Sequence, residues 1–273
     1  MAFQLQQIHS RGTSTPSVAR TMPQGKDIIQ FIKGTNEQRD EAVSVLAELM
    51  KKLIRCVEIQ EQISKAEADA RSGLSNGTLV IQTQANVLRP PSIPDLESKA
   101  ESFLQAAKLA IAQATRLTEP FYGQDFGHQL NKMEKWALDK FGKDHPLVQL
   151  AQGWQPWVKE ILLMRDAVDH PKKTPRGRLH VRNFFVEDRH GKLVLFAPQW
   201  WLEGDPMQAI AEDMGQIIEG VLQLQEHLLI AIFTDLKLDF PCAIYEIPVE
   251  QRNPICPIRL KVGLSNEVKL PDM

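Results

Sequence analysis

A long run of apolar residues at helical spacing constrains the fold of this chain more than any other feature. Its members follow one another at intervals of three or four residues: Met207, Ile210, Met214, Ile217, Val221, Leu224 and Leu228. Because an α-helix makes one turn in about 3.6 residues, these side chains share one face and need other elements to bury them. Asp205 is placed to cap this helix, and Pro206 to occupy its first turn. The segment therefore predicts the closing helix of a bundle.

Earlier segments carry similar patterns, so we expect helices over residues 37–70, 94–117, 124–141 and 145–170. Pro156 lies inside the last of these segments. It predicts either a kink or the first turn of a new helix, and we favour the new helix because proline is tolerated there. The predicted fold class is mostly α.

After residue 170 the apolar residues no longer follow helical spacing. Short apolar runs flank Asp188-Arg189-His190-Gly191 and predict a β-hairpin insertion over about 178–198. We expect one helical domain over 27–236 and an irregular, partly β extension over 237–273, packed on the bundle. Residues 1–26 contain no Asp or Glu, and they predict a disordered tail in preference to an organelle transit peptide.

Composition excludes several classes of protein. The chain has 273 residues, a formal net charge of −2 and three cysteines. No run approaches the roughly 18 consecutive apolar residues of a membrane span, and the separated cysteines argue against a disulfide framework, so we expect a cytoplasmic protein. Common nucleotide, zincin and hydrolase motifs are absent, as are clustered metal ligands. We therefore predict no cofactor and no metal.

Arg165, Asp166 and His170, at the end of a predicted helix, are the strongest candidates for chemistry. Asp166 and His170 share a face, and a widened last turn before Pro171 would bring Arg165 beside them. A histidine can move a proton and a guanidinium can hold a phosphate, which are the parts needed to cleave RNA without metal. The alternative, favoured by spacing alone, pairs Arg165 with Asp169 and leaves His170 as a helix cap.

The same residues resemble the Arg-polar-x3-His motif of the HEPN superfamily. Arg165, Asp166 and His170 match its marked positions, and the order of elements from about 146 to 236 is also similar to that of HEPN bundles. The resemblance implies a HEPN-like helical bundle and a metal-independent endoribonuclease that acts as a homodimer, often as a toxin or in defence, with an antitoxin or regulatory partner. It equally allows an inactive binding module.

Basic residues follow the motif and would suit phosphate: Lys172, Lys173, Arg176, Arg178 and Arg182. A solvated loop is the alternative for this run. Trp200 and Trp201 could stack on bases, although large aromatic residues more often fill a core. Glu219 and Glu226 lie seven apart on the long helix and could support the motif, or could simply form its polar flank.

The leading hypothesis is a metal-independent ribonuclease with His170 as acid or base, Arg165 on the phosphate and Asp166 positioning one of them. The alternative is a non-catalytic helical module that binds a protein partner or a nucleotide. The hypotheses differ in whether Arg165 and His170 lie open in a cleft or are tied to Asp169 and backbone carbonyls.

Overall fold

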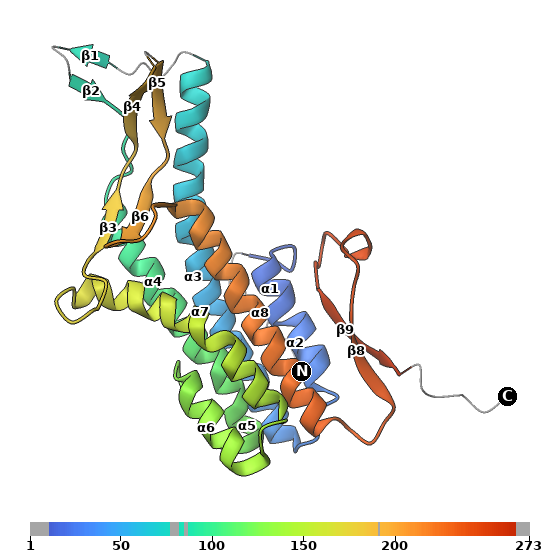
Figure 1. Ribbon diagram of the computed structural model, residues 1–273. Helices are drawn as coiled ribbons and strands as arrows, with labels where there is room; N and C mark the ends of the chain where they lie inside the picture. Colours follow the sequence, from blue (N-terminus) through green and yellow to red (C-terminus); the bar gives the residue numbers. More distant parts are fainter. Residues whose placement is uncertain (1–10, 77–81, 85–86, 191, 266–273) are drawn as a thin grey trace, which may run out of the picture. The chain divides into compact units, whose positions relative to one another are not determined.

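The computed structural model describes residues 11–76, 82–84, 87–190 and 192–265, and within this part the fold is mostly helical (Figure 1). The helices are α1 (Pro16–Thr21), α2 (Pro23–Ile29), α3 (Asn36–Ser75), α4 (Leu96–Thr115), α5 (Glu119–Tyr122), α6 (Leu130–Phe141), α7 (Pro146–Asp169) and α8 (Ile210–Leu236). The strands are β1 (Gln82–Gln84), β2 (Val87–Arg89), β3 (Leu179–Arg182), β4 (Phe185–Arg189), β5 (Lys192–Phe196), β6 (Gln199–Leu202), β7 (Gln208–Ala209), β8 (Cys242–Glu246) and β9 (Leu260–Leu264). The mostly α prediction is confirmed.

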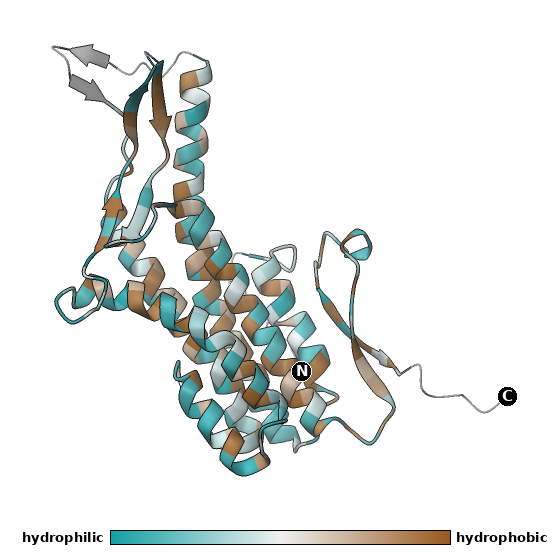
Figure 2. Cartoon of the chain, in the orientation of Figure 1, coloured by the Kyte–Doolittle hydropathy of each residue, from teal (hydrophilic) through white to brown (hydrophobic). Residues whose placement is uncertain are grey.

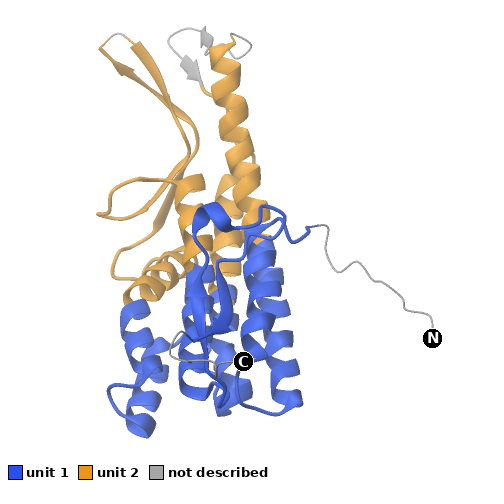
Figure 3. Ribbon diagram, turned by 90° about the vertical axis from the view of Figure 1, so that its right-hand side faces the viewer, with its two compact units in different colours: residues 1–54, 110–155, 221–273 blue, residues 55–109, 156–220 orange. Residues whose placement is uncertain are grey.

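The chain divides into two compact units, coloured separately in Figure 3. Unit 1 contains residues 1–54, 110–155 and 221–273, and unit 2 contains residues 55–109 and 156–220. The long helices α3, α4, α7 and α8 each supply a segment to both units. This division differs from the single domain over 27–236 that the sequence suggests.

Unit 1 packs α2 tightly between α3 and α8. A Cβ added at Gly25 would lie 2.5 Å from Leu46 Cδ1 and 3.5 Å from Leu229 Cδ1, so glycine permits this close approach. Backbone hydrogen bonds from β8 to β9 close an antiparallel pair in the C-terminal segment, with Cys242 opposite Leu264. The predicted extension is therefore partly β.

Unit 2 combines helical segments with a small sheet in the order β3-β6-β7 and the hairpin β4–β5. Trp200 of β6 is fully buried and lies 6.1 Å from Phe103 of α4, measured between ring centroids. A Cβ at Gly220 of α8 would lie 2.3 Å from the Trp157 ring, so this glycine lets the indole seat against the helix. The predicted hairpin is confirmed, with Phe185 opposite Phe196.

The helices carry apolar residues among polar ones, as Figure 2 shows for α3 and α8. The predicted stripe on α8 is buried from Ile210 to Leu228, but Met207 is exposed. By length and composition α8 could cross a membrane. However, 67% of its apolar window is buried inside the protein, which is typical of a core helix.

The structure corrects several sequence predictions. Residues 16–29 form α1 and α2, whose buried side chains include Val18 and Ile28, in place of a tail; residues 1–10 lie outside the described part. Asp205 does not cap α8, because Gln208 and Ala209 first pair with β6 and the helix starts at Ile210. Pro156 lies within a continuous α7, so no new helix begins there.

Candidate functional site

Arg165 lies one turn before the end of α7 and is held by three polar side chains of unit 2. Its Nη2 is 2.5 Å from Asp169 Oδ2, its Nη1 is 3.3 Å from Asp166 Oδ1, and its Nε donates to Gln105 Oε1 at 3.0 Å. The contact with Asp169 is the i,i+4 pair that the alternative hypothesis specifies. The guanidinium charge is therefore already compensated within the chain.

His170 lies immediately after α7 and is exposed. Its backbone N–H donates to the Asp166 carbonyl at 2.7 Å, which completes the last helical turn before Pro171. Among the described residues, no side chain hydrogen-bonds to the imidazole. The structure thus leaves His170 open to solvent while it ties Arg165 to carboxylates.

The predicted phosphate-binding residues fall into two groups. Lys172, Lys173 and Arg178 are exposed, and none has an ion-pair partner within the described chain. Arg176 is different, because its Nη1 lies 2.6 Å from Glu160 Oε1 and 3.0 Å from Asp205 Oδ2. Arg176 therefore fixes the connection between α7 and the sheet, and these carboxylates neutralise its charge.

The strands that follow place basic and aromatic residues on one surface. Directly paired residues of antiparallel strands project from the same face. Leu179 and Leu202, which are paired, are both buried, and so the next pair along, His180 and Trp201, projects from the other face of the sheet. The rings of His180 and Trp201 stack with centroids 5.2 Å apart and planes 14° apart.

A second stack lies along the neighbouring hairpin of β4 and β5. The Arg182 guanidinium lies 3.5 Å from the Phe185 ring centroid, and Phe185 stacks on Phe196 at 4.8 Å. Arg189 covers the same side of the hairpin, 4.6 Å from the Phe196 centroid. We use the name ribbon face for these two neighbouring stacks, which consist of His180, Arg182, Phe185, Arg189, Phe196 and Trp201. Phe185 is itself buried, and Arg189 Nη2 also lies 3.5 Å from Glu187 Oε2.

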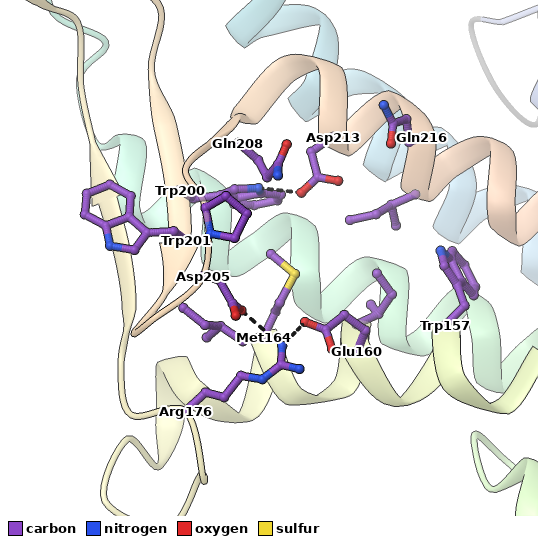
Figure 4. Close-up of a pocket in the computed structure, with 14 residues that line it drawn as sticks. Trp157, Glu160, Met164, Arg176, Trp200, Trp201, Asp205, Gln208, Asp213 and Gln216 are labelled. Carbon is purple, nitrogen blue, oxygen red and sulfur yellow. Dashed lines mark hydrogen bonds and ion pairs between the residues drawn. The ribbon is translucent and has the colours of Figure 1, made fainter.

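Unit 2 also contains a cavity of about 470 Å³ between α7, β6 and the start of α8 (Figure 4). Trp157, Met164 and Trp200 contribute apolar wall, and Glu160 and Asp213 contribute carboxylates. The indole Nε1 of Trp200 donates to Asp213 Oδ2 at 2.6 Å. Burial raises the pKa of the Asp213 carboxyl, the hydrogen bond from Trp200 partly offsets this, and the nearby carboxylates of Glu212 and Glu160 raise it further.

Of the two predicted supporting carboxylates, Glu226 has its own partners in unit 1. Glu226 is buried in unit 1, where Arg20 binds it through two hydrogen bonds of 2.8 and 2.7 Å and Gln24 donates another at 2.7 Å. Arg259 Nη1 is also 3.4 Å from Glu226 Oε2. Glu226 therefore does not orient Arg165. Glu219 is half-buried on α8.

Within the described chain no three His, Cys, Asp or Glu side chains gather in a way that could hold a metal ion. Burial raises the pKa of the Cys56 thiol to about 12, which makes it a poor nucleophile at neutral pH.

Comparison with known proteins identified no relative of this chain. No protein-family model matches the chain, and no curated protein or solved structure matches it significantly.

Sequence reasoning missed part of what the structure brings together. The stacking of Phe185 and Phe196 was not predicted, although the register of the hairpin places them opposite each other. The cavity was also missed, because its walls come from segments that span 60 residues, from Trp157 to Ile217. The signal that was present, the Trp200-Trp201 pair, indicates a strand with one indole on each face.

Proposed function

We propose that this chain is a helical module that binds single-stranded RNA through the ribbon face and the adjacent exposed cations. The observation that carries the proposal is the stacked pair of Phe185 and Phe196 in the hairpin, with the guanidinium groups of Arg182 and Arg189 over their rings. Single-stranded nucleic acid is bound by cations along its backbone and by aromatic or guanidinium planes that stack on its bases.

The charge distribution supports the same ligand. The chain as a whole carries a formal charge of −2, yet Lys172, Lys173 and Arg178 are exposed and unpaired within the described chain. They precede β3, whose His180 and Arg182 continue the ribbon face. One part of an RNA strand can therefore contact the phosphate-binding cations while the neighbouring part contacts the stacking groups.

The experiment is a titration of a fluorescein-labelled 12-nucleotide RNA at several salt concentrations, followed by anisotropy. The Lys172→Ala/Lys173→Ala/Arg178→Ala variant should bind weakly and reduce the salt slope of log K by about 2, since each phosphate contact in a single strand contributes about 0.7. The control is Lys132→Ala/Lys135→Ala/Lys143→Ala, which removes the same charge from exposed sites in unit 1. Equal losses in both variants would show that only overall charge matters.

A second variant separates stacking from charge. Trp201→Ala removes the half-buried indole of the ribbon face, whereas the buried Trp200 stays in place. We expect weaker RNA binding with an unchanged salt slope, because stacking releases no counterions. Unchanged affinity would exclude the ribbon face as the stacking surface.

Ribonuclease activity of HEPN type is the second candidate, favoured by the open imidazole of His170 two residues before Lys172. For this chemistry Arg165 must exchange Asp169 for the scissile phosphate, for example in a homodimer cleft. Purified protein is incubated with a mixed RNA pool in EDTA beside Arg165→Ala/His170→Ala. Cleavage only by the wild type would support the enzyme; no cleavage, with binding retained, would support the binding module.

A further inference from the structure

The cavity of unit 2 has the size and lining of a small-molecule site. Its volume of about 470 Å³ lies in the range of pockets that enclose small organic ligands. The wall includes Ile161 and Met164 of α7 and Ile217 of α8, and the partly exposed indoles of Trp157 and Trp201 supply flat aromatic surface. All of the lining residues belong to unit 2.

The charged groups in the wall make this cavity acidic. The wall contains the carboxylates of Glu160, Asp205 and Asp213 and the guanidinium of Arg176. Arg176 is bound to Glu160 at 2.6 Å and to Asp205 at 3.0 Å, so it neutralises that side of the cavity. No cation within the described chain contacts Asp213, whose Oδ2 accepts only the neutral indole N–H of Trp200.

Asp213 therefore lacks the positive partner that a partly buried carboxylate needs. Figure 4 shows its carboxyl group beside the indole nitrogen of Trp200, and Arg176 on the opposite side, directed to Glu160 and Asp205. An anionic ligand such as a phosphate would meet uncompensated negative charge here. A cation would gain an ion pair with the Asp213 carboxylate.

We propose that this cavity binds a small organic cation, with a protonated amine paired to Asp213 and an apolar body against the partly exposed indoles of Trp157 and Trp201. This site shares Trp201 with the ribbon face, but the proposal does not depend on RNA binding. Binding neutralises the unpaired carboxylate and removes apolar surface from water, so the two halves of the ligand are recognised by different parts of the wall.

The test uses the full chain and two ligands of matched size, 2-phenylethylamine and the neutral 2-phenylethanol. Binding is measured by calorimetry, and the indole N–H signals of the tryptophans are followed in ¹H–¹⁵N spectra. We expect the amine to bind about tenfold or more tightly than the alcohol and to shift the Trp200 signal. Equal affinity for the two ligands, or no binding of the amine, would overturn the proposal.

Asp213→Asn removes the charge but keeps the shape and an oxygen that can accept the Trp200 hydrogen bond. The matched control is Asp139→Asn, at an exposed position of α6 in unit 1. We expect Asp213→Asn to lose about tenfold or more in affinity for the amine while its affinity for the alcohol is unchanged, and Asp139→Asn to bind like the wild type. An amine affinity that is the same in Asp213→Asn and in the wild type would overturn the assignment to Asp213.

Discussion

At the scale of single residues, Glu226 depends on partners that approach from both ends of the chain. Arg20 and Gln24 precede it by more than 200 residues, and Arg259 follows it by 33. Gln24 also accepts the backbone N–H groups of Arg259 and Leu260 through Oε1, at 2.6 and 2.8 Å. One buried carboxylate thus links α1, α2, α8 and the start of β9.

Removing the Glu226 carboxylate should destabilise the folded protein. Glu226→Ala leaves the buried Arg20 guanidinium without its partner, so we expect a loss of about 3–5 kcal/mol in the free energy of unfolding. Urea denaturation measures the loss, and Glu250→Ala, at an exposed site, is the control. A loss below about 1 kcal/mol, typical of exposed pairs, would contradict a buried role.

Removing the charge of Asp213 should have the opposite effect from removing that of Glu226, and should stabilise the protein at neutral pH. Its pKa is raised in the folded protein, so the folded state holds this proton more firmly than the unfolded state does. The contribution of Asp213 is therefore favourable at low pH and is lost as pH rises through the folded pKa. We expect Asp213→Asn to raise Tm at pH 7 and to change it little at pH 3. A lower Tm at pH 7 would contradict this.

The sequence could predict the Arg165–Asp169 pair, because both residues lie on one helix at a spacing of four. It could not predict Gln105 as a further partner of Arg165, since 60 residues separate them. The assignment of Glu226 to the motif failed for a related reason. Helical spacing shows which residues share a face, but not which element packs against that face.

At the scale of elements, α7 contains a proline whose ring should weaken it. Pro156 is exposed and lies inside the helix, where it offers no N–H to the carbonyl of Gln152. Pro156→Ala should stabilise the protein by about 1–3 kcal/mol, since proline costs roughly 3 kcal/mol in a helix interior. Pro146→Ala, at the first position of α7, is the control and should change little. Equal effects of the two substitutions in thermal denaturation would refute the argument.

Elements with sustained periodicity were predictable, and short elements were not. The helix expected over 37–70 exists as α3, Asn36–Ser75, because many apolar residues of one face are buried together. The helices α1 and α2 are six and seven residues long, too short for a periodic pattern to emerge. Their stability comes from tertiary contacts, such as Val18 with Met50 and Ile54, which sequence spacing does not reveal.

At the scale of the whole molecule, the N-terminal segment should be required for folding. A chain that begins at residue 27 lacks Arg20 and Gln24, so Glu226 loses most of its hydrogen bonds and the N–H groups of Arg259 and Leu260 lose their acceptor. We expect this truncated protein to be insoluble or to unfold at a much lower temperature than the full chain. A dispensable tail, as composition suggested, would leave Tm unchanged.

A rescue variant distinguishes loss of the buried charge partners from loss of packing alone. In the truncated chain, Glu226→Met replaces the unpaired carboxylate with an apolar side chain of similar length. We expect it to recover part of the lost stability there, measured by thermal denaturation. In the full chain the same substitution should destabilise, because it strands the Arg20 guanidinium in the interior. Opposite signs in the two backgrounds would show that the N-terminal segment acts through Glu226. A loss of stability in both backgrounds would instead assign its role to packing by side chains such as Val18 and Ile28.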